Sequence, residues 1–471
     1  MEKRTDTPAD DTPPGRVARL RVRLTVPVLA YGGILMALMQ TVVVPLLPAL
    51  PGETDSSPAA VSWMITATLL TGAVLNPILG RAGDMYGKRP VLVGSLVTMT
   101  IGSAMCAVSS DIRVLIFARA LQGTAAAVVP LATSVLRDVL PRHRVGSAVA
   151  LMSSTVGIGA AFGLPVASVV IEHADWHVLF MVTTGLGLLG AAASWWVVPD
   201  SPTRTPGRFD VVGTILLAAG LTAVLLALSQ SGEWGWTGPA VPGLVAGGTA
   251  ILAGWAVHQW RARDPLVDLR LAARRTVALP HIAALLTGFA FYANWLATSQ
   301  LVQASESTGY GLGQSAVVAS LCLLPGGVVM VILSPVSARL SSARGGRFTL
   351  ALGTAVIAAA YVFRVFTSEH LWTIVIGATC CSIGTGLAYS ALPTLILRAV
   401  PQAQTAAATG LNVLMRTIGQ ALCSTAVAAV LIHVAVAGTP TLSAYRTIFT
   451  LAACAAAAAT ITTLCLPREP R

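Results

Sequence analysis

Fourteen long apolar stretches, separated by short segments rich in Gly, Pro or charge, most constrain what this 471-residue chain can become. Each stretch is long enough to cross a bilayer as a helix, which takes about 20 residues. Only 10% of the residues are charged and 55% are hydrophobic, whereas soluble domains carry about 25% charged residues. We therefore predict an all-α polytopic membrane protein with fourteen transmembrane helices and exclude a soluble globular enzyme. The stretches run at approximately 24–50, 59–80, 90–109, 112–136, 146–171, 178–198, 210–230, 238–258, 277–303, 314–338, 348–367, 371–397, 405–436 and 444–466.

The placement of the basic residues predicts the topology. The formal net charge is +11, which in a soluble protein would suggest a nucleic-acid partner. Here most of the 30 Lys and Arg residues fall in the two tails and in alternate connections, and the other connections are acidic or neutral. The positive-inside rule then places both termini in the cytoplasm of a multi-pass plasma-membrane protein, with the bilayer and not nucleic acid as its partner. The first 23 residues lack the pattern of a cleaved signal peptide.

A weak internal repeat predicts the domain organisation. The basic, Gly-containing turn at 80–89 has an echo at 337–347. Two such turns indicate a duplicated six-helix unit, with two bundles related by pseudo-two-fold symmetry and a substrate site between them. The predicted parts are a cytoplasmic tail (1–23), an N-terminal six-helix bundle (24–199), an inserted two-helix hairpin with its linkers (200–276), a C-terminal six-helix bundle (277–466) and a second tail (467–471).

The turn at 80–89 carries a specific pattern made by Gly80, Asp84, Gly87, Lys88 and Arg89. It resembles the G-x-x-x-D-x-x-G-x-R signature of the major facilitator superfamily. Glycine permits a tight turn and close helix approach, and a carboxylate can stabilise a helix start or pair with basic groups. The resemblance implies that these residues form a gating latch; an ordinary charged loop anchor is the alternative.

Further patterns extend the resemblance over residues 24–466 and to the fourteen-helix drug:proton antiporters. Gly159, Gly163 and Pro165 are similar to an antiporter motif of the G-x-x-x-G-P type, with the proline displaced by one residue. A G-x-x-x-G spacing lets helices pack closely. The segments 210–213 and 232–236 look like the inserted hairpin of that family, and 412–419 resembles a pattern of its penultimate helix.

One departure concerns ion coupling. Relatives commonly carry an Asp in the first helix where this chain has Met39, and none of its 19 acidic residues lies near a helix midpoint. The segment around Arg119 and Gln122 is similar to the family's R-x-x-Q-G motif, and an Arg at bilayer depth usually turns to a cavity or a carboxylate. Snorkelling to the interface is the alternative. The coupling candidates are therefore Arg119 with Glu172 or Asp175, although the two acids could equally be solvated loop charges.

Polar side chains within the apolar stretches are candidates for a central cavity, because polar groups at bilayer depth are often functional. Each could instead hydrogen-bond a neighbouring helix. Aromatic residues at 289, 291, 292 and 295 could form one wall, although at helical spacing packing is the commoner role. The candidates are Gln40, Thr41, Asn76, Gln122, Asn294, Gln300, Gln303, Asn412, Arg416 and Gln420.

These features predict a secondary active transporter that exports amphipathic drugs, antibiotics or secondary metabolites by proton-coupled antiport, and implicate it in bacterial antibiotic resistance. The alternative is a transporter of a lipid or an anionic metabolite with no ion coupling or a different one. Enzyme motifs such as HExxH, GxSxG and the P-loop are absent, so no catalytic residue, cofactor or enzyme activity is expected. Seven cysteines lie within apolar stretches without a CxxC pair, which favours core packing over a metal site. A monomer is expected.

Overall fold

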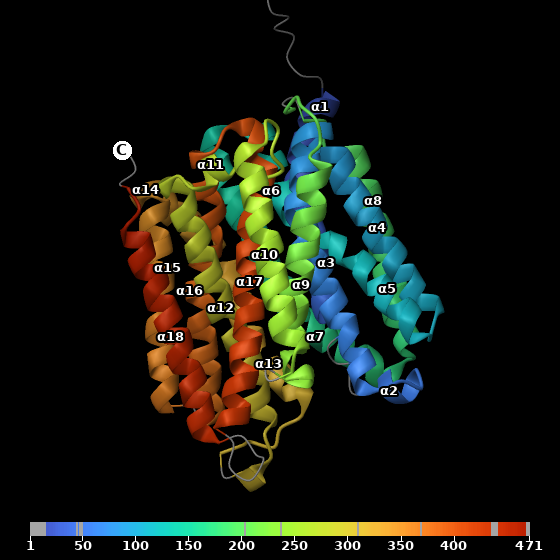
Figure 1. Cartoon of the computed structure of the whole chain (residues 1–471), viewed down its shortest axis with the longest axis vertical. Helices are drawn as coiled ribbons and strands as arrows, with labels where there is room; N and C mark the ends of the chain where they lie inside the picture. Colours follow the sequence, from blue (N-terminus) through green and yellow to red (C-terminus); the bar gives the residue numbers. More distant parts are fainter. Residues whose placement is uncertain are drawn as a thin grey trace, which may run out of the picture.

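The structure is a computed structural model that describes residues 16–43, 46, 50–201, 204–235, 238–308, 310–367, 370–434 and 441–467. Every regular element in these ranges is a helix (Figure 1). This confirms the all-α fold class. In a bilayer a helix satisfies its own backbone hydrogen bonds, which is why apolar stretches of this length adopt it.

The helices follow the predicted stretches in order along the chain. The first half contains α1 (Arg16–Thr41), α2 (Leu50–Glu53), α3 (Pro58–Tyr86), α4 (Lys88–Val108), α5 (Ile112–Gln122), a 3-10 turn (Gly123–Ala127), α6 (Val128–Val139), α7 (Arg142–His173), α8 (Trp176–Val197) and α9 (Val211–Trp234). The second half contains α10 (Ala240–Arg261), α11 (Leu269–Ala272), α12 (Arg275–Gln303), α13 (Ala316–Ile332), α14 (Ser334–Arg344), α15 (Gly346–Thr367), α16 (Leu371–Ala399), α17 (Thr405–His433) and α18 (Leu442–Leu464).

Three predicted stretches are interrupted. The first divides into α1 and the short α2, and the fourth is broken by the 3-10 turn between α5 and α6. The stretch at 314–338 extends to residue 344 as α13 and α14, which bend by 46° at Leu333. Pro335 lies in the first turn of α14, where its missing N–H leaves no helical hydrogen bond unmade.

The number of membrane spans is lower than predicted when judged by length and hydropathy. Over the described residues, twelve helices are long and apolar enough to cross a membrane, or thirteen if α13 and α14 form one bent span. The count of fourteen is therefore not confirmed. α7 is the long helix that lies outside this set.

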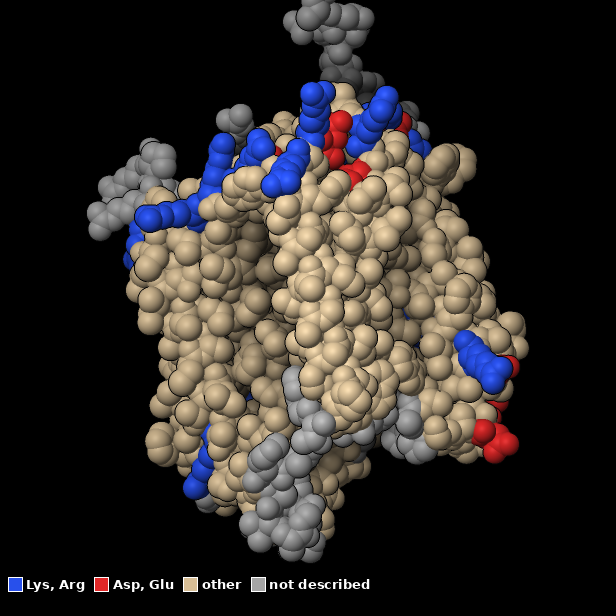
Figure 2. Space-filling model, viewed as in Figure 1, with Lys and Arg blue, Asp and Glu red and all other residues tan. Residues whose placement is uncertain are grey.

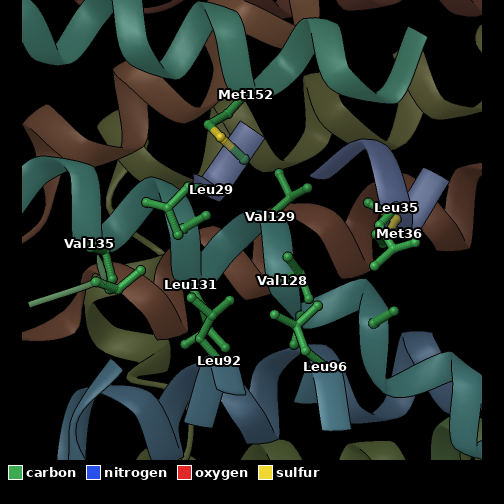
Figure 3. Packing of buried hydrophobic residues seen from close by; sticks show 14 of the residues in the cluster. Leu29, Leu35, Met36, Leu92, Leu96, Val128, Val129, Leu131, Val135 and Met152 are labelled. Carbon is green, nitrogen blue, oxygen red and sulfur yellow. The ribbon is translucent and has the colours of Figure 1, made fainter. Parts of the chain in front are cut away.

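Buried apolar residues gather in separate clusters on the two sides of the molecule. One cluster packs α1, α4, α6, α7 and α8 together, and Figure 3 shows Leu92 and Leu96 of α4 facing Leu131 and Val128 of α6. A second cluster joins α12, α13, α15, α16, α17 and α18. A third packs α9 and Trp255 of α10 against α3 and α17. The α9–α10 pair thus covers the line along which α3 meets α17.

Lys and Arg side chains gather at one end of the helical bundle, at the top of Figure 2. We call it the basic end; it contains the connections from α3 to α4, from α10 to α12 and from α14 to α15. The chain enters α1 there (Figure 1). α18 also finishes there, because the Arg347 guanidinium donates to the Leu464 carbonyl at 2.5 Å. The helices therefore bring the basic connections together, as their alternation along the sequence indicates.

Candidate functional site

Asp84, near the end of α3, binds the first turn of α17. Its carboxylate oxygens accept hydrogen bonds from the backbone N–H groups of Ala406 (3.2 Å) and Ala407 (2.9 Å). The first N–H groups of a helix have no partner within the helix and carry partial positive charge, so a carboxylate stabilises them. Asp84 is 1% exposed. The predicted latch residue thus caps a helix whose first turn lies 322 residues further along the chain.

The glycines of the motif allow this contact. A Cβ on Gly80 would lie 2.6 Å from the Ala406 carbonyl oxygen, so only glycine lets α3 approach the start of α17 this closely. Gly87 adopts a φ of +110° at the turn into α4, a conformation that side chains with a Cβ rarely tolerate. Further from the basic end, where α17 also packs against α3, a Cβ on Gly410 would lie 2.7 Å from the Asn76 carbonyl oxygen.

Lys88 forms a buried ion pair with Asp138 of α6. The distance from Lys88 Nζ to Asp138 Oδ2 is 2.6 Å, and the side chains are 0% and 1% exposed. Lys88 Nζ also donates to the Thr405 hydroxyl at 3.3 Å, and Asp138 accepts from Gln402 at 3.0 Å and Ser201 at 2.7 Å. The pair therefore links α4 and α6 to the start of α17.

Arg89 plays a different part from Lys88. Its guanidinium lies 3.2 Å from a carboxylate oxygen of Asp200, whose side chain is 67% exposed, and 4.7 Å from the centre of the Trp195 ring. Exposed ion pairs contribute little free energy. Of the five motif residues, Gly80, Asp84 and Lys88 contact α17 or its first residue, Gly87 shapes the turn, and Arg89 stays on the surface of α8.

Several other hydrogen bonds join the chain before residue 200 to the chain after residue 276. Arg137 donates to the Val400 carbonyl at 3.2 Å, and Ser134 contacts Thr405. Near mid-depth, Ser153 donates to the Tyr389 carbonyl at 2.8 Å. With the contacts of Asp84 and Lys88, the bonds of Arg137 and Ser134 join these two parts of the chain at the basic end.

Arg119 lies inside the bundle and does not snorkel. It is 1% exposed, and its guanidinium donates to the carbonyl oxygens of Met39 (2.9 Å) and Met64 (3.4 Å) and to Gln122 Oε1 (2.5 Å). Gln122 in turn donates to Ser103 at 3.0 Å. No ion pair within the described ranges includes Arg119. Arg119 therefore joins α5 to α1 at Met39.

Asp175 is not brought to Arg119 in this structure. It precedes α8, is exposed, and accepts hydrogen bonds from the His177 backbone N–H (2.8 Å) and from His177 Nδ1 (2.6 Å). The backbone hydrogen bond, followed by the one from the ring, holds the pKa of the Asp175 carboxyl below its usual value. The side chain of Glu172 lies outside the described residues. Pairing of Arg119 with either acid is therefore not seen here.

Gly159 and Gly163 mark the crossing of α7 with α1. A Cβ on Gly159 would lie 2.2 Å from the Ala37 Cβ, and a Cβ on Gly163 would lie 2.0 Å from the Thr41 hydroxyl. That hydroxyl lies 3.2 Å from the Gly159 carbonyl, to which it donates. Pro165, two residues on, sits inside α7 and cannot donate a helical hydrogen bond. These glycines serve close packing, as their spacing predicts.

Replacing Gly159 with Ala is expected to destabilise the protein by about 1–3 kcal/mol, because the added methyl overlaps α1. Gly185 of α8 is the matched control, since a Cβ at that position would meet nothing within 4 Å. Gly185→Ala should leave stability unchanged or raise it by up to about 1 kcal/mol through helix propensity. Thermal unfolding of the purified protein measures both; equal shifts for the two variants would contradict close packing at Gly159.

The cavity candidates occupy several different surroundings. Gln40 and Gln303 are exposed; Thr41, Asn76, Gln122, Asn294 and Asn412 are buried; Gln300, Arg416 and Gln420 are half-buried. Asn412 lies 3.5 Å from His281 Nδ1, and the Arg416 guanidinium lies 4.5 Å from the centre of the Tyr389 ring. They therefore do not form one continuous polar surface in this conformation.

Two small cavities lie between helices of the interior. One has a volume of about 80 Å³ and includes Thr66, Tyr292, Thr417 and Gln420 in its lining. The other, about 30 Å³, lies between α7 and the helices α12, α13 and α16. Phe291, Asn294 and Trp295 line it, so three of the predicted wall and cavity residues meet there. Both are too small for a drug-sized ligand, for which pockets are about 300–1,000 Å³.

Arg364 of α15 is a buried residue that is not among the candidates predicted from the sequence. It is 0% exposed, and its guanidinium donates to Asn294 Oδ1 (2.6 Å) and Thr298 Oγ1 (2.9 Å) of α12. It also lies 4.1 Å from the centre of the Phe449 ring. As the single charged residue of the apolar stretch 348–367, it carried a visible signal. Arg364 fastens α15 to α12 much as Arg119 fastens α5 to α1.

No group of three or more His, Cys, Asp or Glu side chains that could hold a metal ion occurs among the residues that the structure describes. The site is built from hydrogen bonds of Asp84 and Arg119 to backbone groups, from the Lys88–Asp138 ion pair and from close helix crossings. Such contacts can hold one end of a helical bundle closed and release it.

Comparison with known proteins gives a family and a fold. The model of the Major Facilitator Superfamily matches residues 29–424 and 283–471. Curated relatives, provisionally named multidrug resistance protein MdtD, include one from Escherichia coli O81 that is 32% identical over 253 residues, 54% of each chain. Another, from Cronobacter sakazakii, is 32% identical over 262 residues, 55% of each chain. The aligned part of the chain thus spans about half the length of the curated relatives it matches.

A solved structure shows the same fold. The crystal structure of the human organic anion transporter MFSD10 (TETRAN) superposes with a TM-score of 0.68 at 15% sequence identity, covering 96% of this chain and 100% of that one. The family match, the helical architecture and the motif at the α3–α4 turn agree. The chain therefore belongs to the major facilitator superfamily.

Proposed function

We propose that the protein is a secondary active transporter that exports amphipathic small molecules across the plasma membrane by alternating access, with protons entering in exchange. The observation that carries the proposal is the contact of the Asp84 carboxylate with the first turn of α17. It ties the chain before residue 200 to the chain after residue 276, and it must break before the basic end can open. A reversible lock at one end is what alternating access requires.

The proposed architecture is a pair of six-helix bundles, 24–199 and 277–466, related by pseudo-two-fold symmetry. The α9–α10 pair within 200–276 is an insertion, and fourteen spans result when α7 and the bent α13–α14 pair are each counted. The separate apolar clusters support the division. So do Arg119 and Arg364, each of which fastens the first helix of its own bundle.

The basic end is proposed to face the cytoplasm, together with both tails, because the positive-inside rule assigns the basic connections to that side. A cysteine placed at exposed Ala240 should then be labelled from outside and one at exposed Ser342 should be spared. Under this orientation the structure is a state closed to the cytoplasm. All of the contacts that support this proposal lie within one chain, so we propose that the protein works as a monomer.

The proposed cargo class follows from the relatives and from the interior. The MdtD proteins are named for multidrug resistance. Aromatic and uncharged polar side chains line the small interior cavities, with no acidic residue in either lining. Cavities of this composition suit apolar molecules with a few polar groups, and would widen when the bundles rock apart.

Proton coupling in this protein cannot use an acid in the first helix. Met39 replaces the usual acid of the first helix, so we assign the carrier role to Glu172 or Asp175, with Arg119 as a neighbour in another conformation. In the present conformation the hydrogen bonds from His177 hold the pKa of Asp175 below its usual value, so this carboxylate takes up a proton less readily than a free one.

The experiment is transport by the purified protein in liposomes with an imposed pH gradient. Wild-type protein should move a fluorescent cationic or neutral dye only when the gradient is present, and an uncoupler should abolish the movement. A Glu172→Gln, Asp175→Asn double variant should lose gradient-driven transport while keeping dye exchange at equilibrium; Asp111→Asn at the same end is the matched control. If the double variant still moves protons with dye, those acids are not the carriers.

The alternative is a transporter of a lipid or an anionic metabolite that is uncoupled or coupled to another ion. Arg119 inside the bundle, whose hydrogen bonds within the described chain go to carbonyl oxygens, favours it. Dye transport by the wild-type protein at the same rate with and without a pH gradient would support this alternative. Membership of a transporter family excludes an enzyme.

A further inference from the structure

A large apolar groove lies on the surface of the bundle between the α9–α10 pair and α11, α12 and α17. Its volume is about 700 Å³, within the range of about 300–1,000 Å³ that ligand sites occupy. Apolar residues dominate its lining, and Val257, Trp260 and Ile282 at its rim are 53%, 50% and 47% exposed. The groove therefore opens on the face of the protein that meets lipid.

A second, polar cavity of about 160 Å³ adjoins the groove at the basic end. Arg81 and Arg263 line it, and it shares Ala272, His281 and Leu411 with the groove. A pocket with two guanidinium groups and an apolar groove thus lie side by side and share part of their walls. A molecule that fills both parts has an anionic head and an apolar tail.

Arg81 is buried beside the polar cavity, and no acid is in contact with it. It is 6% exposed, and it makes no hydrogen bond or ion pair with the residues that the structure describes. Asp84 lies near enough to feel its charge, but the oxygens of that carboxylate bind the start of α17. A buried cation without a direct counter-ion is costly, and an anionic group in the cavity would satisfy it.

The two acids that line the polar cavity are engaged elsewhere. Asp264 accepts a hydrogen bond from the Arg208 backbone N–H at 3.2 Å, and Asp268 accepts one from the Leu271 N–H at 3.0 Å. Neither carboxylate forms an ion pair within the described ranges. Neither Arg81 nor Arg263 forms an ion pair within the described ranges, so their guanidinium groups can bind an anionic ligand.

Two residues that line the groove, Trp255 and His281, each have a buried ring nitrogen without a hydrogen-bond partner within the described part of the chain. The atoms are Trp255 Nε1 and His281 Nε2, and their residues are 9% and 6% exposed. The Asn412 amide nitrogen lies 3.5 Å from His281 Nδ1. With Nδ1 as the acceptor, the ring proton resides on Nε2. Both atoms are then donors that require an acceptor such as an ester carbonyl.

We propose that one anionic phospholipid of the bilayer occupies this space, with its phosphate between Arg81 and Arg263, its ester carbonyls near Trp255 and His281, and an acyl chain in the groove. Arg81, which no acid contacts, favours the anionic headgroup, because arginine binds phosphate oxygens through paired hydrogen bonds, while Asp264 and Asp268 accept from backbone N–H groups. The lipid packs the α9–α10 pair against α12 and α17. None of the residues that line this site lines the two small interior cavities.

Trp255 and Trp260 line the groove, so their fluorescence can report binding there. Bromine atoms on an acyl chain quench the fluorescence of nearby indole rings. Full-length protein in detergent micelles is titrated with phosphatidylglycerol or with phosphatidylcholine, each carrying brominated acyl chains. Phosphatidylglycerol should quench in a saturable step at roughly tenfold lower concentration than phosphatidylcholine, a preference set by the two guanidinium groups. A Trp255→Phe, Trp260→Phe variant should lose that step.

Charge variants locate the headgroup. Arg81→Gln should bring the phosphatidylglycerol titration close to that of phosphatidylcholine. Exposed Arg263→Gln, which cannot unfold a core, should weaken it several-fold. Arg339→Gln, an exposed charge of the same end outside the cavity, is the matched control and should change nothing. Equal quenching by both lipids in wild-type protein overturns the proposal, as does a preference that survives Arg263→Gln or the loss of both tryptophans.

Discussion

Asp84→Asn is expected to lower transport by about tenfold or more while the affinity for cargo changes only a few-fold. The amide keeps the size of the side chain but loses the charge that stabilises the N–H groups of Ala406 and Ala407. Hydrogen bonds to a charged group are worth about 1.5–3 kcal/mol, so their weakening shifts the balance between states closed and open at the basic end. Transport requires both states, whereas a cavity remote from Asp84 should still bind cargo in the Asp84→Asn variant.

The measurement pairs dye binding to detergent-purified protein with transport in liposomes. Asp200→Asn is the control, because Asp200 is an exposed acid of the same end whose ion pair with Arg89 contributes little. It should leave both readings unchanged. Loss of dye binding with preserved turnover at saturating dye would make Asp84 a cargo contact and remove it from the gate.

Lys88→Met is expected to destabilise the protein by about 3–5 kcal/mol, because it leaves the Asp138 carboxylate buried without its counter-ion. Asp138 would keep only the hydrogen bonds from Gln402 and Ser201. Replacing both partners, Lys88→Met with Asp138→Leu, should recover most of the loss, since an apolar pair of similar volume often substitutes for a buried ion pair.

Thermal unfolding of the purified variants tests this expectation. Arg89→Gln, one residue away, removes a partly exposed pair and should cost less than about 1 kcal/mol. If Lys88→Met is no more destabilising than Arg89→Gln, the buried ion pair does not hold α4 to α6. If the double variant is as unstable as the single one, the carboxylate left behind is not the cause.

The helical fold was predictable because hydropathy over twenty residues is a strong local signal, and the alternation of Arg between connections placed the basic end. The Asp84 turn was predictable because its glycines and acid occur at fixed spacing. The partner of Asp84 was not, because backbone N–H groups of Ala406 and Ala407 leave no mark in the sequence. A carboxylate that caps a distant helix is visible only once the chain is folded.

Other parts of the site failed to follow from the sequence for similar reasons. In the sequence Arg81 is one of several basic residues near a connection between helices, whereas in the structure it is buried beside a cavity. Arg364 is a charged residue within an apolar stretch of the sequence, but its hydrogen-bond partners come from another helix and could not be predicted. The bend at Leu333, in contrast, lies two residues before Pro335, which lacks the N–H needed to continue α13, so the sequence carried a local signal there.

The acceptor of Arg119 on α1 is the main-chain oxygen of residue 39, and a main-chain oxygen does not titrate. The acceptor of the hydrogen bond between α5 and α1 is therefore the same at every pH, and it does not depend on which side chain residue 39 carries. A lineage could exchange an acid for methionine here without loosening the helix. What such an exchange removes is the sensitivity of that spot to pH, while its mechanical strength is retained.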